Sequence, residues 1–307
     1  MVFHPPVAIV AKAGDAGKYK VGLPWWNMIL RGFMSGAYIA MGGALATVCS
    51  TGIAFAASKE ALALVPNAAA GMSSAGMGAL ITGAVFPVGL IITVLTGAEL
   101  FTGDAMLAPL AAFIHKVSVM EVMNLWVWVY IGNLIGSLVW AYIMAYGPFI
   151  SVDPATQATT VTAFGMRAIG IAAFKVQYVG LMGMWSCFLK AVACNWMVNL
   201  AILLGICADD LIGKFFGIWF PIMAFVSSGF EHSIANQYFI SAGILTKGMA
   251  TEAQLATINA AQLQNLNWIG FWTNNMIVVT IGNIVGGLFF VGVIYWVAFR
   301  KEIAALK

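Results

Sequence analysis

TGAELFTGD at residues 96–104 and SSGFEHSIAN at residues 227–236 each place a glutamate and several small residues inside a long apolar segment. Each stretch follows a Phe-Pro pair, at residues 86–87 and 220–221. A proline removes one backbone hydrogen bond from a helix, and a carboxylate at this depth in a bilayer is costly. Non-helical backbone persists there only where protein buries it or where it lines an aqueous cavity. The pattern therefore predicts two broken membrane-spanning helices beside a pore.

The composition places the chain among integral membrane proteins. Of its 307 residues, 62% are hydrophobic and 8% are charged, and the formal net charge is +3. Soluble domains carry about 25% charged residues, so this chain could not cover a water-facing surface. The small, dispersed net charge does not indicate a nucleic-acid partner. The cysteines lie mostly in apolar runs without metal-ligand or CxxC spacing, so we expect no metal site, no cofactor and no disulfide.

Six stretches are long and apolar enough to cross a bilayer as helices, which takes about 20 residues each. We expect one transmembrane transport domain over residues 1–307, in which residues 1–24 form a cytoplasmic arm rather than a signal peptide. The link over residues 246–267 is expected to hold a short amphipathic helix. The segments lie at about 26–52, 76–114, 120–146, 184–207, 213–245 and 268–299.

The third and sixth segments resemble each other, because YIGNLIGSL holds Asn133 and TIGNIVGGL holds Asn283. The chain therefore divides into two related halves of three segments, 26–146 and 184–299. Three is an odd number, so the halves must have opposite orientations in the bilayer. Inverted repeats with paired interruptions are a recurrent transporter design. The glycines of these motifs could pack helices closely or contact solute, and we expect the asparagines to contact solute.

The placement of Lys and Arg predicts the orientation, since cytoplasmic loops are enriched in both. If the N-terminus is inside, the inner side holds more of them than the outer side. This balance favours a multi-pass protein of the cytoplasmic membrane with both termini in the cytoplasm. The inner set is Lys12, Lys18, Lys20, Arg31, Lys116, Lys214, Arg300, Lys301 and Lys307, and the outer set is Lys59, Arg167, Lys175, Lys190 and Lys247.

One histidine, His232, lies deep in an apolar stretch, directly after Glu231, whereas His4 lies in the arm and His115 at a segment end. A bland interpretation is a core histidine that donates to a backbone carbonyl. Ionisable groups inside a membrane are usually functional, however. Histidine also exchanges protons near neutral pH. We therefore favour a role of His232 in handling solute or protons.

These residues resemble the formate–nitrite transporter family over nearly the whole chain, from Trp26 to Arg300. TGAELFTGD is similar to the loop that interrupts the second helix in that family, and CNWMVNLAI at residues 194–202 is similar to its fourth-helix motif. GFEHSIAN and TIGNIVGG resemble its fifth-helix and sixth-helix motifs. Four motifs in the right order make the similarity specific. It implies an all-α, aquaporin-like fold and a homopentamer in the lipid bilayer with one pore per protomer.

The resemblance also implies roles for individual residues. A central chamber would be flanked by Thr102 and His232, with Asn195 and Asn283 nearby. Glu231 would support the second interruption by bonding its backbone. The outer constriction would involve Phe86, Leu90 and Phe225, and the inner constriction Leu100 and Val198. The gating loop would contain Glu99, Phe101, Gly103 and Asp104.

Two positions depart from the pattern of the family. Asp104 stands where the family commonly has Asn or Ser, which could alter loop mobility or gating. The outward-facing lysine ahead of the fourth helix has no clean match, because Val179 occupies the equivalent spacing and Lys175 lies four residues too far upstream. The resemblance therefore gives less support for attraction of anions at the outer vestibule.

Together these features predict a channel or proton-coupled transporter that moves formate. A formate anion would enter the chamber, accept a proton passed through His232 and cross the apolar ring as the neutral acid. Nitrite or hydrosulfide could be the substrate instead. A neutral-solute pore of aquaporin type is disfavoured because paired Asn-Pro-Ala loops are absent from the sequence. An intramembrane enzyme or haem subunit is disfavoured because the sequence has no HExxH motif and a single deep histidine.

Overall fold

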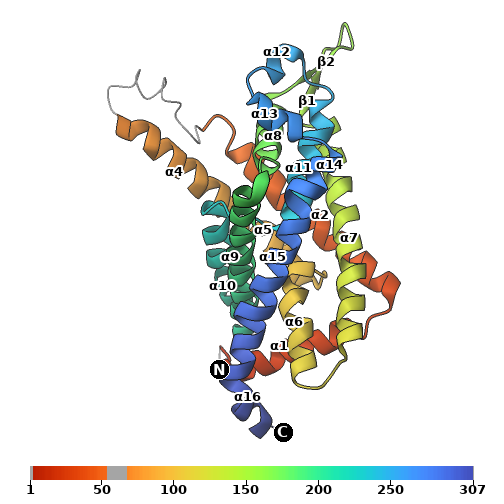
Figure 1. Cartoon of the computed structure of the whole chain (residues 1–307), viewed down its shortest axis with the longest axis vertical. Helices are drawn as coiled ribbons and strands as arrows, with labels where there is room; N and C mark the ends of the chain where they lie inside the picture. Colours follow the sequence, from red (N-terminus) through yellow and green to blue (C-terminus); the bar gives the residue numbers. More distant parts are fainter. Residues whose placement is uncertain (1–2, 54–67, 307) are drawn as a thin grey trace.

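Helices that run along the long axis of the molecule form most of the structure (Figure 1). The computed structural model describes residues 3–53 and 68–306, so that Lys59 and Lys307 of the orientation argument lie outside the described residues. A two-stranded antiparallel hairpin lies at one end of the bundle, and both chain termini lie at the other.

The first half begins with the helix α1, which occupies much of the expected arm and packs against α6 and α16. α7 starts at a capping box, in which the side chains of Ser118 and Glu121 each accept a hydrogen bond from the backbone N–H of the other. The elements of this half are α1 (Pro6–Val21), α2 (Trp25–Cys49), α4 (Ala68–Val85), α5 (Val88–Thr96), α6 (Phe101–Phe113) and α7 (Val119–Tyr146).

The second half follows the hairpin and also begins with a short helix, α8, which packs against α11. Its last membrane segment continues from Trp268 to Ala305 and contains two π-helical turns, η1 and η2. The hairpin consists of β1 (Ile150–Val152) and β2 (Thr159–Val161). The helices are α8 (Ala163–Lys175), α9 (Gly180–Cys207), α10 (Leu211–Ser227), α11 (Ser233–Lys247), α12 (Glu252–Leu255), α13 (Ala260–Asn265), α14 (Trp268–Phe271), η1 (Trp272–Met276), α15 (Ile277–Gly287), η2 (Leu288–Val293) and α16 (Ile294–Ala305).

Among the described residues, 5 helical stretches are long and apolar enough to cross a membrane: Trp25–Cys49, Gly76–Thr96, Val119–Tyr146, Gly180–Cys207 and Trp268–Ala305. The fifth expected segment is interrupted and appears as α10 and α11, which have 17 and 15 residues. The second segment is likewise divided, into α5 and α6. The prediction of a polytopic helical membrane protein with a broken second and fifth helix is confirmed.

Both interruptions begin with a glycine in the left-handed backbone region. The φ angle is +74° at Gly97 and +69° at Gly229, a conformation that glycine adopts without steric cost. Each glycine lies two residues before a glutamate, Glu99 or Glu231, and the next helix begins two residues after that glutamate. The small residues in the two motifs therefore turn the chain, as the sequence indicated.

The link over residues 246–267 differs from its prediction. It contains two short helices, α12 and α13, in place of one amphipathic helix. The side chain of Asn259 accepts hydrogen bonds from the N–H groups of Ala261 and Gln262, so it caps a new helix at that point.

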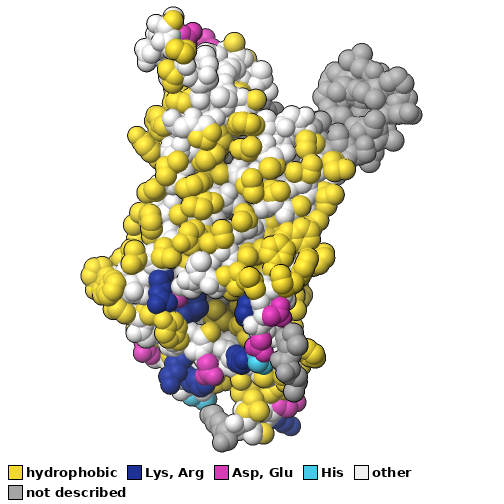
Figure 2. All heavy atoms as spheres, turned by 180° about the vertical axis from the view of Figure 1, so that it is seen from behind, with side chains coloured by type: hydrophobic (Ala, Val, Ile, Leu, Met, Phe, Trp, Pro, Cys, Tyr) yellow, Lys and Arg dark blue, Asp and Glu magenta, His cyan; other side chains and the backbone are white. Residues whose placement is uncertain are grey.

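The charged residues are distributed unevenly along the bundle. Seen from behind, apolar side chains cover the middle of the molecule, and most charged side chains visible on this face gather toward the end that carries the termini (Figure 2). An apolar band flanked by a charged end is the surface expected of a protein that spans a bilayer.

Small residues bring pairs of membrane helices into close contact. A Cβ atom on Gly136 of α7 would lie 2.0 Å from the carbonyl oxygen of Phe33 in α2. In the second half, a Cβ on Gly286 of α15 would lie 2.4 Å from the carbonyl oxygen of Val192 in α9. These glycines of the third and sixth segments therefore serve helix packing, which was one of the two alternatives open from the sequence.

We expect Gly136→Ala to separate α7 from α2 and to lower the stability of the protein by about 1–3 kcal/mol. Thermal unfolding in detergent measures this loss. Gly170→Ala in α8 is the matched control, because a Cβ there meets no atom within 4 Å. Equal melting temperatures for the two variants would contradict the packing argument.

Candidate functional site

The first interruption is held by one carboxamide. Asn133 of α7 donates from Nδ2 to the carbonyl oxygens of Gly32 and Glu99, at 2.8 and 2.9 Å. Its Oδ1 accepts from the backbone N–H of Phe101 at 3.0 Å, where α6 begins. The bonds to Glu99 and Phe101 therefore satisfy backbone groups that the break leaves without helical partners, and the bond to Gly32 ties the break to α2.

The second interruption is held in the same way. Asn283 of α15 donates from Nδ2 to the carbonyl oxygens of Ala191 and Glu231, at 2.8 and 3.0 Å, and its Oδ1 accepts from the N–H of Ser233 at 2.8 Å. The expectation that both asparagines contact solute differs from this geometry. Their amides face the backbone because a buried break in a helix needs hydrogen-bond partners that the bilayer cannot supply.

Thr102 and His232 meet between the two interruptions. Thr102 Oγ1 lies 3.0 Å from His232 Nε2, and both side chains are buried. His232 Nδ1 accepts a hydrogen bond from the N–H of Ala235 at 3.1 Å. A ring nitrogen that accepts carries no proton, so this contact assigns the proton of the neutral ring to Nε2. His232 therefore caps α11 with one nitrogen and presents an N–H to Thr102 with the other.

The backbone of Thr102 is fixed by two further asparagines. Its carbonyl oxygen accepts from Asn195 Nδ2 at 3.0 Å and from Asn199 Nδ2 at 3.1 Å. The sequence pointed to Asn195 but missed Asn199, although the two are four residues apart in CNWMVNLAI and therefore share one face of α9. The role of Asn195 in this structure is to position Thr102.

Two helix N-termini begin at this centre. α6 starts at Phe101 and α11 starts at Ser233, one residue from Thr102 and His232 respectively. The N-terminus of a helix carries a partial positive charge equivalent to about half an elementary charge. The centre can therefore stabilise an anion by the dipoles of two helices without a fixed cation.

One pocket, which we name the Lys175 vestibule, opens on the side of His232. It has a volume of about 160 Å³, and its lining includes Phe86, Phe225, Lys175 and His232. The rings of Phe86 and Phe225 meet edge to face with centroids 6.0 Å apart, and Phe225 stacks on His232 at 5.8 Å. The two phenylalanines thus form an apolar neck directly beside the histidine.

A second pocket, the Lys20 vestibule, opens on the side of the first interruption. It has a volume of about 220 Å³, and its lining includes Leu90, Leu100 and Lys20. Leu90 was expected in the same constriction as Phe86, but the two line different vestibules. Val198, the other expected member of the inner constriction, lies in the surrounding apolar core.

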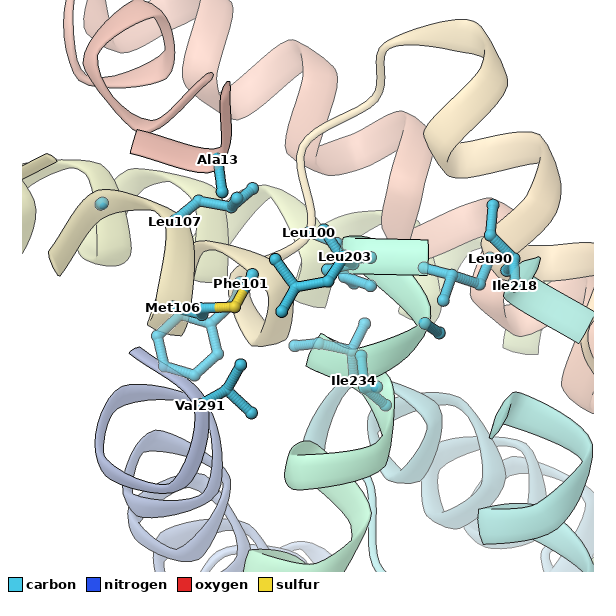
Figure 3. Close-up of a cluster of buried hydrophobic side chains, with 14 of the residues drawn as sticks. Ala13, Leu90, Leu100, Phe101, Met106, Leu107, Leu203, Ile218, Ile234 and Val291 are labelled. Atoms are coloured by element: carbon cyan, nitrogen blue, oxygen red, sulfur yellow. The ribbon is translucent and has the colours of Figure 1, made fainter. Parts of the chain in front are cut away.

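Apolar side chains pack around the first interruption (Figure 3). Leu100 lies in one buried cluster with Leu203 of α9 and Ile234 of α11. The ring of Phe101 packs edge to face against Tyr130 of α7, with centroids 4.9 Å apart. A Cβ on Gly103 would lie 2.6 Å from the side chain of Ile202. The expected gating loop is therefore packed on several sides in this structure.

The carboxylate of Glu231 binds side chains rather than the backbone of the interruption, in contrast to the expectation. Lys175 Nζ and Tyr178 Oη each lie 2.9 Å from it, and Asn236 Nδ2 lies 2.6 Å from it. Burial and then the charge of Glu231 raise the pKa of Tyr178 above its usual value, so the phenol stays protonated and donates. Lys175 reaches this site because α8 ends beside α11. It lines the Lys175 vestibule although the sequence spacing had placed it too far upstream.

The carboxylates at the first interruption bind a cation that the sequence did not indicate. Lys20 of α1 forms ion pairs with Glu99 and with Asp104, the latter at 3.0 Å. Arg31 lies 3.7 Å from the other oxygen of Glu99. Burial lowers the pKa of Lys20, but the charges of Asp104 and Glu99 raise it further, so the pKa lies above its usual value and the ammonium stays charged.

Comparison with known proteins identifies the family of this chain. A model of formate/nitrite transporters matches residues 7–297. The chain belongs to the formate/nitrite transporter family.

Its relatives in this family are similar over most of their length. The chain is 40% identical to the probable formate transporter of Methanothermobacter thermautotrophicus over 98% of both chains. It is 29% identical to the formate channel FocA of Escherichia coli strain K12, over 97% of this chain and 95% of the relative. A solved pentameric formate channel with formate bound has a TM-score of 0.69 and 31% identity, over 90% of this chain and 98% of that one.

We expect Asn283→Asp in this transporter to lower its stability, because the variant keeps the acceptor for Ser233 but loses both donors. The carbonyl of Ala191 keeps its helical partner within α9, but that of Glu231 is left buried without a donor, which costs roughly 1–3 kcal/mol. Thermal unfolding of the purified protein measures the loss. Asn265→Asp is the control, since its amide makes an exposed hydrogen bond to the carbonyl of Ala261 at the end of α13. A loss that is no larger for Asn283→Asp than for the control would contradict the assigned role.

Proposed function

We propose that the chain forms a homopentamer with one pore per protomer and passes formate, together with a proton, across the cytoplasmic membrane. The observation that carries this proposal is the contact between Thr102 and His232. It lies between two helix N-termini and beside the neck formed by Phe86 and Phe225. The alternatives within this class are nitrite and hydrosulfide.

The apolar neck sets the physical problem that the centre must solve. A bare anion that leaves water for an apolar passage loses its hydration at a cost of many kcal/mol. Two helix N-termini and the Nε2–H of His232 offset part of that cost at the centre. Formate has two oxygen atoms, so it can accept from His232 and from the hydroxyl of Thr102 at the same time. Conversion to formic acid would remove the charge before the neck.

Proton transfer requires a change at Nδ1 of His232. In the present conformation Nδ1 accepts from the N–H of Ala235, so the neutral ring has one proton, on Nε2, and loss of that proton would leave an imidazolate. We infer that Ala235 N–H releases Nδ1, which then takes up a proton. The imidazolium transfers its Nε2 proton to a formate oxygen, which yields formic acid and a neutral ring protonated at Nδ1.

The positions of the chain termini support an orientation of the protein in the membrane. Both termini lie at one end of the bundle, together with α1, the helix that contains Lys20 (Figure 1). The excess of Lys and Arg at that end favours a cytoplasmic position. The Lys20 vestibule then faces the cytoplasm, and the Lys175 vestibule faces the other side.

We expect His232→Asn to abolish the dependence of formate uptake on a proton gradient while pentamers still assemble. An asparagine can donate a hydrogen bond at this position but cannot exchange a proton near neutral pH. Radiolabelled formate uptake into proteoliposomes, with and without an inward proton gradient, measures the coupling. His115→Asn is the matched control, because His115 is exposed and has a φ of +59°, which asparagine tolerates. Unchanged proton coupling in His232→Asn would exclude the relay.

The identity of the anion is tested in the same vesicles. We expect unlabelled formate to compete with labelled formate more strongly than nitrite or hydrosulfide does. Stronger competition by nitrite or hydrosulfide would assign that anion as the preferred substrate in place of formate.

A further inference from the structure

The two vestibules share a set of contacts that recurs at equivalent positions. A lysine from the last turn of the preceding short helix binds the glutamate of each interruption: Lys20 binds Glu99, and Lys175 binds Glu231. The backbone N–H of Glu99 donates to the carbonyl oxygen of Arg31 at 3.1 Å. The N–H of Glu231 donates in the same way to Lys190, at 3.4 Å.

The correspondence extends to a second cation in each half. Arg31 donates to the hydroxyl of Tyr19 at 3.0 Å, and Lys190 donates to the hydroxyl of Tyr178 at 3.1 Å. Each of these cations also lies over the ring of its tyrosine, at 5.6 and 5.1 Å from the centroid. The two vestibules are therefore built from similar parts, apart from the hydrogen bond that Tyr178 also donates to Glu231, and one difference between them changes the charge.

That difference lies five residues after each glutamate. In the second half this position is Asn236, whose amide donates to Glu231 at 2.6 Å. In the first half it is Asp104, which is fully buried and cannot donate to Glu99. Within the described part of the chain, the ammonium of Lys20, 3.0 Å from Oδ1, is the one group that compensates the carboxylate of Asp104.

The substitution changes the charge balance of one vestibule. The charged residues that line the Lys175 vestibule are the cations Arg167 and Lys175. Lys175 binds the carboxylate of Glu231, and a third cation, Lys190, donates to Tyr178 beside it, so three cations face one carboxylate and leave an excess of positive charge. Around the Lys20 vestibule, the two cations face two carboxylates and the charges cancel. The four charged residues that line that pocket are Lys20, Arg31, Glu99 and Asp104.

We propose that Asp104 makes anion binding weaker in the Lys20 vestibule than in the Lys175 vestibule. Formate then half-saturates transport at a lower concentration from the Lys175 side. The inference rests on the proposed function. A cleft with an excess of one charge raises the local concentration of the opposite ion. Two carboxylates, Glu99 and Asp104, hold the ammonium of Lys20 and neutralise it for an incoming anion, whereas one carboxylate, Glu231, holds Lys175.

The test compares the half-saturating formate concentration from each side. Proteoliposomes are sorted for one protein orientation by the accessibility of a C-terminal tag, and initial uptake is measured at equal pH on both sides. In Asp104→Asn, the new amide can donate to Glu99 as Asn236 donates to Glu231, so the substitution introduces an arrangement that the fold already contains. We expect it to lower the half-saturating concentration on the Lys20 side by roughly two- to fivefold.

Two further variants sharpen the test. Asn236→Asp adds a carboxylate to the Lys175 vestibule, so it should raise the half-saturating concentration on that side. Asp15→Asn removes a carboxylate from α1 outside the vestibule, where Asp15 pairs with Lys116 and is 62% exposed, so both half-saturating concentrations should stay at their wild-type values.

The outcomes separate this inference from the function on which it rests. Saturable formate uptake with equal half-saturation on both sides of the wild type, or with no change in Asp104→Asn, would overturn the role of Asp104 alone. An equal shift in Asp15→Asn would also overturn it, because the effect would then be one of general surface charge. Absence of saturable formate uptake by the wild type would overturn the proposed function and this inference together.

Discussion

The need to satisfy polar backbone inside a bilayer constrains everything else in this molecule. Each broken helix leaves carbonyl and N–H groups without helical partners, and the hydrocarbon offers none. Asn133 and Asn283 supply two donors and one acceptor apiece, in the same pattern at both interruptions. A carboxylate of the same size has no donors, and a leucine has neither donors nor acceptors. The carboxamides therefore hold the breaks, and the breaks in turn place two helix N-termini at the centre.

The fixed breaks determine which atoms face that centre. Since α11 begins directly after His232, the ring caps the helix through Nδ1 and leaves Nε2 directed at Thr102. Since α9 places Asn195 and Asn199 on one face, both amides hold the carbonyl of Thr102. The polar centre is thus pre-positioned by neighbours that already have their own hydrogen bonds. An anion that enters meets donors that need little reorganisation.

The sequence revealed features that depend on the local residues, and it missed those that depend on packing between helices distant in the chain. Glutamates and glycines inside apolar runs are unusual on their own, so the two interruptions and His232 could be predicted. Lys20 and Lys175 bind carboxylates 79 and 56 residues away, and these pairs form only where α1 and α8 pack. The asparagines were located correctly but given a wrong role, because an amide can face solute or backbone and composition does not distinguish the two.

The two halves keep the same framework and differ where a solute would pass. Leu100 and His232 occupy equivalent positions, with φ and ψ of −118° and 118° in one case and −109° and 118° in the other. The backbone there accepts an apolar or an ionisable side chain without altering its path. In the proposed mechanism, one half therefore supplies the apolar barrier and the other the group that exchanges a proton. A pore with histidine at both positions would lack the barrier at Leu100, and one with leucine at both would have no proton to give, so the proposed coupling of an anion to a proton depends on the difference between these two matched positions.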